Sequence, residues 1–351
     1  METVEKIAKR LVQIQSDSDK SKVLLYSAKF LKKLGGKVTV TKKEPRFLLA
    51  RFGKPGGILF AGHLDTVSSP RPPKKKPGVI SGGKLWGLGA SDMKGGCAAV
   101  LATAQRLRGR VPFAVAFTTD EETRMEGAAI LAKNPLVKKA AIIIIPEPTN
   151  MLVATSEKGT LQLEIRIWGK TAHGSMPWFG KNAAQRLVHF LSHLEFLQDP
   201  EMHLPDGITV NLGMLKAGTA ANIVPDFASA TIDVRYPPSL NPMVVVRRIR
   251  ETLGGSGVKW EVRKLHEVEP LEFDVNCPQA QTFLRVADTR VAPVMYATEA
   301  TCYGSAGKPI LVCGPGRPEL AHQQDEFVDV FQLKKAEHAY TSFCLALMKG
   351  K

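Results

Sequence analysis

Three nearly uninterrupted apolar stretches constrain the fold of this 351-residue chain more than any other feature. They are GILFAGHLD at 57–65, VPFAVAFTTDEE at 111–122 and AAIIIIPEP at 140–148, and each ends in acidic or imidazole side chains. Strands that are apolar on both faces are typical of parallel sheets covered on both sides. Stretches with helical apolar spacing lie between them. The alternation predicts an α/β domain with a mostly parallel sheet and helices on both faces.

The other elements of this domain follow from the same periodicities. Before residue 154 we expect strands at 37–40 and 46–52, and helices at 3–14, 21–34, 93–108 and 126–133. After residue 268 the α/β pattern resumes, with a helix near 279–288, a buried strand at 309–314 and a last helix near 331–348. We therefore expect one discontinuous domain made of residues 1–154 and 269–351.

The middle of the chain, residues 155–268, has a different pattern. In TLQLEIRIWGK at 160–170 apolar and polar residues alternate, which indicates a strand with one face in water. The following expected elements are a helix at 182–197, strands at 208–215 and 228–236, a helix at 242–253 and a strand at 258–265. This β-α-β-β-α-β order predicts an inserted ferredoxin-like domain with helices on one face of its sheet.

Hydropathy and cysteine content exclude several classes of protein. No apolar run approaches the roughly 20 residues of a membrane-spanning helix. The first ten residues, METVEKIAKR, lack the apolar region of a signal peptide. The five cysteines are odd in number and form no CxxC pair, which argues against a disulfide framework or a thiolate zinc site. We therefore expect a cytoplasmic protein.

The formal net charge of +15 leaves an anionic substrate, an acidic partner protein or nucleic acid open. The densest basic cluster is RPPKKKP at 71–77. It is rich in proline and lacks the interleaved aromatic residues of a single-strand-binding surface. We interpret it as an exposed loop and do not expect a nucleic-acid partner.

Polar side chains follow each buried strand, where α/β sheets place their sites. His63 and Asp65 end the first strand, Glu121 and Glu122 follow the second, and Glu147 ends the third. A metal-binding imidazole needs an acceptor at its other nitrogen, which Asp65 can supply directly or from close behind His63. Of two neighbouring glutamates, one can bind metal while the other takes a proton from metal-bound water.

Two further candidates lie beside glycines. Asp92 is in GASDMKGG, before an expected helix, and His322 is in ELAHQQDE, after the last buried strand. Taken alone, Asp92 is as easily a helix N-cap. Together, five imidazole and carboxylate ligands near strand ends and helix starts predict a site for two divalent metals. A nitrogen and oxygen ligand set without sulfur favours zinc, with cobalt and manganese as alternatives.

The motifs GHLDT, GASDMKGG, TTDEE, PEPT, GKTAHGSMP and AHQQDE resemble, in order and spacing, the dinuclear zinc aminoacylases. That family includes acetylornithine deacetylase, succinyl-diaminopimelate desuccinylase, carboxypeptidases and tripeptidases. The resemblance implies a hydrolase for the amide bond of an N-acyl amino acid, and a homodimer formed through the inserted domain, which acts as a lid. The TEA sequence at 298–300 resembles the acetylornithine deacetylase branch more than the desuccinylase branch.

The resemblance also implies how the metal ligands are divided. His63 and Glu147 bind one metal, Glu122 and His322 bind the other, and Asp92 bridges the two. Asp65 then orients His63. The chain would therefore hold two divalent ions.

Further roles implied by the resemblance concern the reaction and the substrate. Glu121 is the general base, and His173 stabilises the oxyanion across the dimer interface. Asn222 and Arg235 hold the substrate carboxylate, and Gly316 contacts the substrate through its backbone.

Other functions remain open at this point. A dipeptidase, tripeptidase or carboxypeptidase uses the same metal core. A non-enzymatic binding protein would lack a ligand or the base, and this chain has all five ligands and Glu121. The net charge leaves a polyanion-binding function, recognised by strong salt dependence, or an acyl substrate tethered to an acidic carrier protein.

Overall fold

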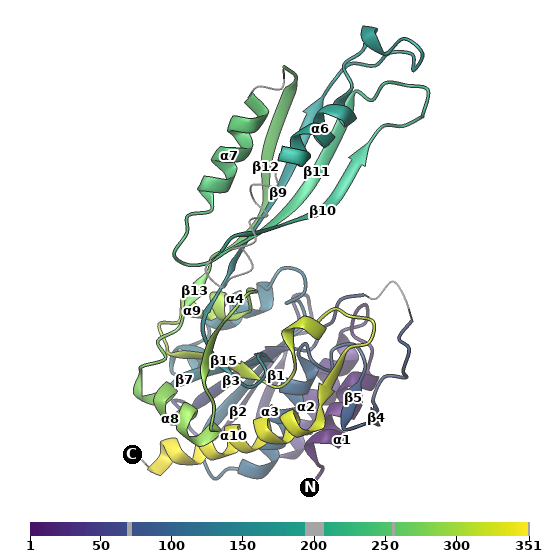
Figure 1. The fold of residues 1–351 in the computed structure, drawn as a ribbon. Coiled ribbons are helices and arrows are strands. Elements are labelled where there is room, and N and C mark those ends of the chain that lie inside the picture. The colour runs from purple at the N-terminus through teal and green to yellow at the C-terminus, as the bar shows by residue number, and fades with distance from the viewer. Residues whose placement is uncertain (69–71, 194–206, 255–256, 350–351) are drawn as a thin grey trace. The chain divides into compact units, whose positions relative to one another are not determined.

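The computed structural model describes residues 1–68, 72–193, 207–254 and 257–349, and it divides into two compact units (Figure 1). The first unit comprises Met1–Thr155, Phe273–Ala292 and Thr298–Lys351, and the second comprises Ser156–Glu272 and Pro293–Ala297. Residues 194–197 of the helix predicted at 182–197, and the first residue of the basic cluster, lie outside the described residues. Within the described residues, no helix is both long and apolar enough to cross a membrane.

A six-stranded sheet in the order β1-β2-β6-β3-β7-β15 forms the centre of the first unit. Its strands are β1 (Lys37–Val40), β2 (Phe47–Phe52), β3 (Ile58–His63), β6 (Phe113–Thr118), β7 (Ile142–Pro148) and β15 (Ile310–Gly314). Four strands, β6, β3, β7 and β15, are parallel, whereas β1 and β2 are antiparallel at one edge. Every residue of the four parallel strands is buried, which agrees with their apolar sequences.

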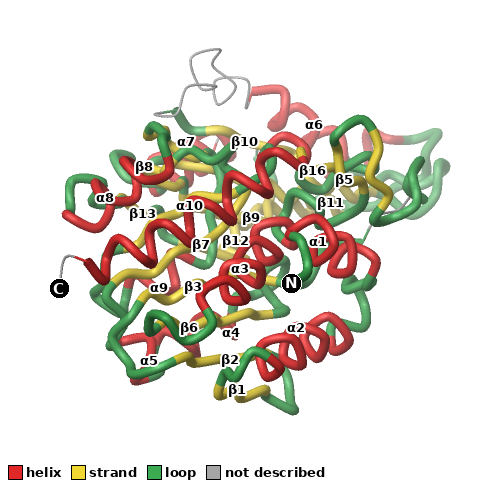
Figure 2. Tube along the Cα trace, turned by 90° about the horizontal axis from the view of Figure 1, so that it is seen from below, coloured by secondary structure: helices red, strands yellow, loops and turns green. Residues whose placement is uncertain are grey.

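Helices cover both faces of this sheet (Figure 2). The helices of this unit are α1 (Val4–Gln13), α2 (Ser21–Lys33), α3 (Lys94–Leu107), α4 (Glu126–Ala132), α5 (Pro135–Lys138), α8 (Pro278–Ala287), α9 (Ala300–Gly304) and α10 (Val330–Lys349). Helix α3 is almost entirely buried and contacts β3 and β7 as well as α1 and α10. A Cβ atom at Gly96 would collide with the carbonyl oxygen of Pro146 in β7, so glycine is needed for this close approach.

Six further short strands lie in the part of the chain that the structure describes. β4 (Val79–Ser81), β5 (Lys84–Trp86) and β16 (Phe327–Asp329) form a small antiparallel sheet in the first unit. β8 (Val153–Glu157), β13 (Leu271–Glu272) and β14 (Val291–Val294) form another sheet, in the order β13-β8-β14, where the chain passes from one unit to the other. None of these six was predicted.

The second unit has the predicted β-α-β-β-α-β order. Its elements are β9 (Gly159–Trp168), α6 (Ala183–Ser192), β10 (Thr209–Ala217), β11 (Phe227–Tyr236), α7 (Met243–Gly254) and β12 (Lys259–Val268). The strands form an antiparallel sheet in the order β10-β11-β9-β12, the arrangement of a ferredoxin-like fold. Alternate residues of β9, from Leu161 to Ile167, are buried in one core with apolar residues of β11, α6 and α7. Strand β10 is an edge of this sheet.

Candidate metal centre

The carboxyl ends of three neighbouring parallel strands supply most of the predicted ligands. His63 is the last residue of β3, and Glu147 lies near the end of β7, which pairs with β3. Glu121 and Glu122 follow β6, the other neighbour of β3. Because parallel strands end at the same edge of a sheet, these four side chains converge there.

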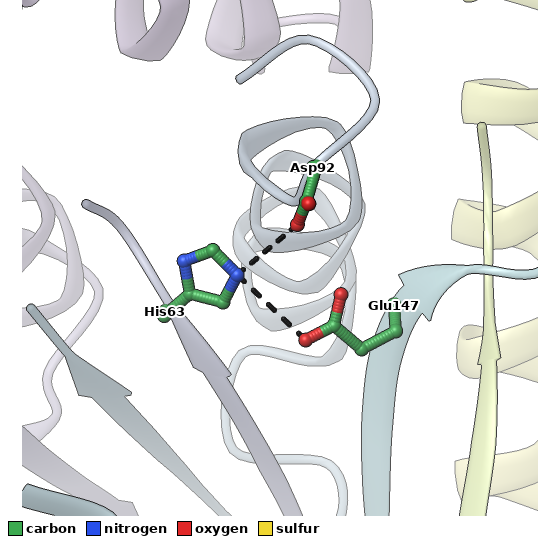
Figure 3. Close-up of side chains that lie close together, drawn as sticks. All are labelled: His63, Asp92 and Glu147. Carbon is green, nitrogen blue, oxygen red and sulfur yellow. Dashed lines mark hydrogen bonds and ion pairs between the residues drawn. The ribbon is translucent and has the colours of Figure 1, made fainter. Parts of the chain in front are cut away.

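Asp92 lies at the centre of the cluster. Oδ1 of Asp92 is 3.2 Å from Nε2 of His63 (Figure 3). The same His63 nitrogen is 3.7 Å from Oε1 of Glu147. Oδ2 of Asp92 is 3.4 Å from Nε2 of His322. Nε2 of His322 is in turn 3.0 Å from Oε2 of Glu122. The structure therefore brings all five predicted metal ligands together.

Two overlapping groups of ligand atoms could each hold one cation. His63, Asp92 and Glu147 form one group, and Asp92, Glu122 and His322 form the other, with the ligand atoms of each group within 4.8 Å of one another. A third combination, His63, Glu121 and Glu122, meets the same geometric criterion. The first two groups share only Asp92, so they match two adjacent metal positions joined by one carboxylate.

The charges of the cluster show whether its residues suit two adjacent cations. Burial raises the pKa values of Glu121 and Glu147 well above the ordinary value, and the neighbouring carboxylates raise them further. Hydrogen bonds to Asp92 and Glu122 raise the pKa of His322 to about 10. So many carboxylates in a mostly buried space are unfavourable unless cations compensate them. The four carboxylates and two imidazoles therefore fit two divalent metal ions, with imidazole and carboxylate ligands suited to zinc.

His63 is supported on the side away from the cluster. Its Nδ1 lies 3.1 Å from the backbone oxygen of Asp65 and 3.5 Å from the Asp65 carboxylate. The Asp65 side chain is fully buried, and Lys20 donates to its Oδ2 at 3.2 Å. Lys20 was not predicted, because it lies in the polar stretch SDSDKSK, which has no feature that links it to residue 65.

Two buried glutamates beside the cluster were also missed. Glu326 accepts hydrogen bonds from the backbone N–H groups of Gly89, Ser91 and Asp92. Glu299 accepts a hydrogen bond from the hydroxyl of Thr118, and burial raises its pKa to about 7. Glu299 belongs to the TEA sequence, which we used only to compare branches of the family and not to assign a role to Glu299. Glu326 follows Asp325, and its sequence resembles an exposed acidic turn.

The residues predicted to bind substrate in the inserted domain belong to the second unit. His173 forms an isolated β-bridge with Ile223, and the N–H of Gly174 donates to the carbonyl of Asn222 at 2.7 Å. His173 and Asn222 are therefore close neighbours, and both are exposed. Nε of Arg235 pairs with Oδ1 of Asp233 at 2.6 Å.

Gly316, in the first unit, has a φ of +106°. Its N–H donates to Oε1 of Gln332 at 2.5 Å, and its carbonyl accepts from the N–H of Asn150 at 2.8 Å. A Cβ atom at this position would collide with Ser91. Both backbone polar groups of Gly316 are thus engaged inside the protein.

Known proteins with similar sequences include metal-dependent hydrolases. Residues 59–346 match Peptidase family M20/M25/M40. The chain is 32% identical to acetylornithine deacetylase of Proteus mirabilis over 326 residues, which are 85% of this chain and 83% of that protein. It is equally 32% identical to acetylornithine deacetylase of Vibrio atlanticus over 336 residues, 89% of this chain and 88% of that protein.

Solved structures show the same fold. A tripeptidase from Staphylococcus aureus superimposes with a TM-score of 0.81 at 21% identity, covering 99% of this chain and 98% of that chain. An M20 family metallo-carboxypeptidase from Sulfolobus solfataricus superimposes with a TM-score of 0.79 at 18% identity, covering 98% of this chain and 99% of that chain. The chain belongs to peptidase family M20/M25/M40 and is a metal-dependent hydrolase of amide or peptide bonds.

Proposed function

We propose that the chain removes the acyl group from an N-acyl amino acid, as acetylornithine deacetylase does, with two divalent metal ions that are most simply zinc. The observation that carries the two-metal site is the position of Asp92, with one carboxylate oxygen beside His63 and the other beside His322. The similarity to acetylornithine deacetylases over more than four fifths of the chain supports the substrate class.

Glu121 is our proposed general base. Its carboxylate is largely buried, and its Oε2 lies 3.9 Å from Nε2 of the proposed metal ligand His63. Two divalent cations would polarise the substrate carbonyl and lower the pKa of water. Glu121 would take the proton of the attacking water and pass it to the leaving amine, the task of a general acid–base group.

The second unit supplies the proposed substrate-binding residues. Within this proposal an imidazole donor from His173 stabilises the oxyanion, while Asn222 and Arg235 hold the substrate carboxylate. The guanidinium group of Arg235 would then give up part of its ion pair with Asp233, because the Asp233 carboxylate and the substrate carboxylate compete for the same donors. Gly316 remains a proposed backbone contact that would require its present hydrogen bonds to rearrange.

The second unit also carries a surface suited to a homodimer. Along the edge strand β10 the side chains of Leu212, Met214 and Leu215 are each about half exposed, at 46%, 51% and 51%. An edge strand offers unpaired N–H and carbonyl groups to another strand, and apolar side chains add burial. We propose that a second copy of the chain pairs here.

The proposed substrate class is tested by a panel of amides. Protein loaded with zinc, and in parallel with cobalt or manganese, is assayed with acetylornithine, succinyl-diaminopimelate, other N-acyl amino acids and short peptides. We expect the highest kcat/KM for an acetylated amino acid. A higher value for di- or tripeptides would contradict the deacylase proposal and assign the chain a peptidase function on the same metal core.

A second measurement addresses the charge of +15. If anionic macromolecules or an acidic carrier protein were the partners, binding would weaken steeply with salt. We expect activity on small N-acyl amino acids to change little over the same salt range. Activity found only with carrier-tethered substrate would contradict the small-molecule proposal.

A further inference from the structure

One buried carboxylate connects two of the segments that carry metal ligands. Oε1 of Glu326 accepts from the N–H groups of Ser91 at 2.7 Å and Asp92 at 2.9 Å, and Oε2 accepts from the N–H of Gly89 at 2.9 Å. Glu326 is only 1% exposed. Its carboxylate therefore binds the backbone of the turn that presents Asp92.

Glu326 also belongs to the segment that presents His322. It lies four residues after His322 and directly before β16, and its N–H donates to the carbonyl of Gln323 at 3.2 Å. Its own carbonyl accepts from the N–H of Gly87 at 2.9 Å. Both the backbone and the side chain of Glu326 thus attach the His322 segment to the Gly87–Asp92 turn.

Backbone donors and one buried lysine favour the charged form of Glu326. Lys94, two residues after Asp92, is 1% exposed and has a favourable electrostatic interaction with Glu326. Burial raises the pKa of Glu326 to about 7, and the three backbone N–H donors oppose this effect by favouring the ionised carboxylate. An amide side chain at position 326 would lose the charge and would turn an N–H₂ group toward backbone donors.

We propose that Glu326 is a positioning residue that sets the separation of Asp92 and His322, and so the metal affinity of the pocket formed by Asp92, Glu122 and His322. This inference rests on the two-metal site of the proposed function. Glu326 itself touches no substrate and contributes no ligand atom.

The two metal pockets should depend on Glu326 unequally. His63 and Glu147 are held by β3 and β7, which are hydrogen-bonded to each other within the central sheet. His322 lies outside any strand or helix, has a φ of +62°, and its side chain is 52% exposed. Loss of the Glu326 contacts therefore affects the His322 pocket more than the His63 pocket.

The experiment is a zinc titration of metal-free Glu326→Gln by calorimetry, together with cobalt titration followed by visible absorption. We expect the first equivalent to bind as in the unmodified protein and the second to bind 10–100-fold more weakly, the usual effect of removing a residue that supports ligands. Saturating zinc should restore much of kcat. Glu337→Gln is the matched control, because Glu337 is a buried carboxylate on α10 that pairs with Arg106 and is not part of the cluster.

Each outcome decides the proposal. Two equivalents bound with unchanged affinity, or both weakened equally, would overturn it. If Glu326→Gln does not fold, Glu326→Asp is titrated instead, since it keeps the charge but withdraws the carboxylate; failure of both to fold would make Glu326 a folding residue and overturn the positioning role. An unmodified protein that binds only one metal would contradict the two-metal site itself, which is a different result.

Discussion

Nε2 of His322 lies 3.4 Å from Oδ2 of Asp92, whereas Nε2 of His63 lies beside the other carboxylate oxygen, Oδ1. A carboxylate that presents its two oxygens to two different imidazoles can bridge two cations roughly 3.5–4 Å apart, the spacing of two-metal sites. The roles of the ligands can therefore be separated by single substitutions.

The first prediction concerns metal stoichiometry. Asp92→Ala removes the ligand that both pockets share, so we expect metal binding to be weakened at both positions. His322→Ala removes a ligand of one pocket only, and we expect close to one metal per chain. Elemental analysis after loading and desalting measures both. Equal loss of metal in the two variants would show that Asp92 does not bridge.

The second prediction separates Glu121 from Glu122. Glu121→Gln should keep both metals and its substrate affinity, while kcat falls by about 10²–10⁴ or more, because the proton acceptor is lost. Metal analysis and steady-state kinetics of the same sample test this. If the variant instead loses metal and keeps its rate per bound metal, Glu121 is the ligand and Glu122 the base.

The third prediction concerns pH and the ion pair behind His63. Burial alone would raise the pKa of Asp65, but His63 and Lys20 hold it below the ordinary value. A lowered pKa in the folded protein gives stability that is present above the unfolded-state value of about 3.9 and is lost as the pH falls through the folded value. Lys20→Met should therefore reduce the free energy of unfolding at pH 7 by about 1–3 kcal/mol, and by progressively less below about pH 4.

Urea denaturation of the metal-free protein at several pH values measures this effect. Lys22→Met is the matched control, since Lys22 pairs with Asp19 at 3.3 Å between two exposed side chains and should contribute little. A Lys20→Met variant as stable as the control at pH 7 would show that the buried charge of Asp65 does not depend on Lys20.

The fourth prediction concerns the proposed dimer. If His173 acts on the active site of the partner chain, then His173→Ala and Glu121→Gln, each inactive alone, should regain activity when mixed, because some active sites in the heterodimer receive both intact residues. Subunit exchange is verified by mass spectrometry of the mixture. Absence of recovery despite exchange would place His173 in its own chain's site or outside the reaction.

The interface is tested separately with Met214→Glu on β10. A charge in an apolar edge contact should shift the protein toward monomers in analytical ultracentrifugation. A fully active monomer would contradict the cross-chain mechanism.

The large elements were predictable because the hydrophobic pattern of each sequence indicates which faces of the strand or helix are buried. The continuous apolar sequence of β7 requires cover on both sides, and the alternation in β9 requires one wet face; both expectations were confirmed. His63 and Glu147 were located by the same reasoning, since polar residues that end buried strands must meet at one edge of the sheet.

The supporting residues could not be predicted from local pattern. Lys20 and Asp65 are 45 residues apart, and Glu326 and Ser91 are 235 apart. Nothing around Glu326 distinguishes a buried carboxylate from an exposed acidic turn, because its burial is created by a distant backbone turn. The strands β4, β5 and β16 were missed since three residues do not establish a period.

The discontinuity of the first unit has a consequence for how the protein is made. On the ribosome, β7 lacks its neighbour β15 until residues 310–314 have emerged, so an apolar parallel strand remains at an open sheet edge while the whole second unit is synthesised. Such edges invite pairing with other chains. His322 emerges later still, and Asp92 and His322 cannot hold a metal together before then. Newly made chains therefore lack both the strand that covers β7 and the pocket formed with His322 during the same interval of synthesis.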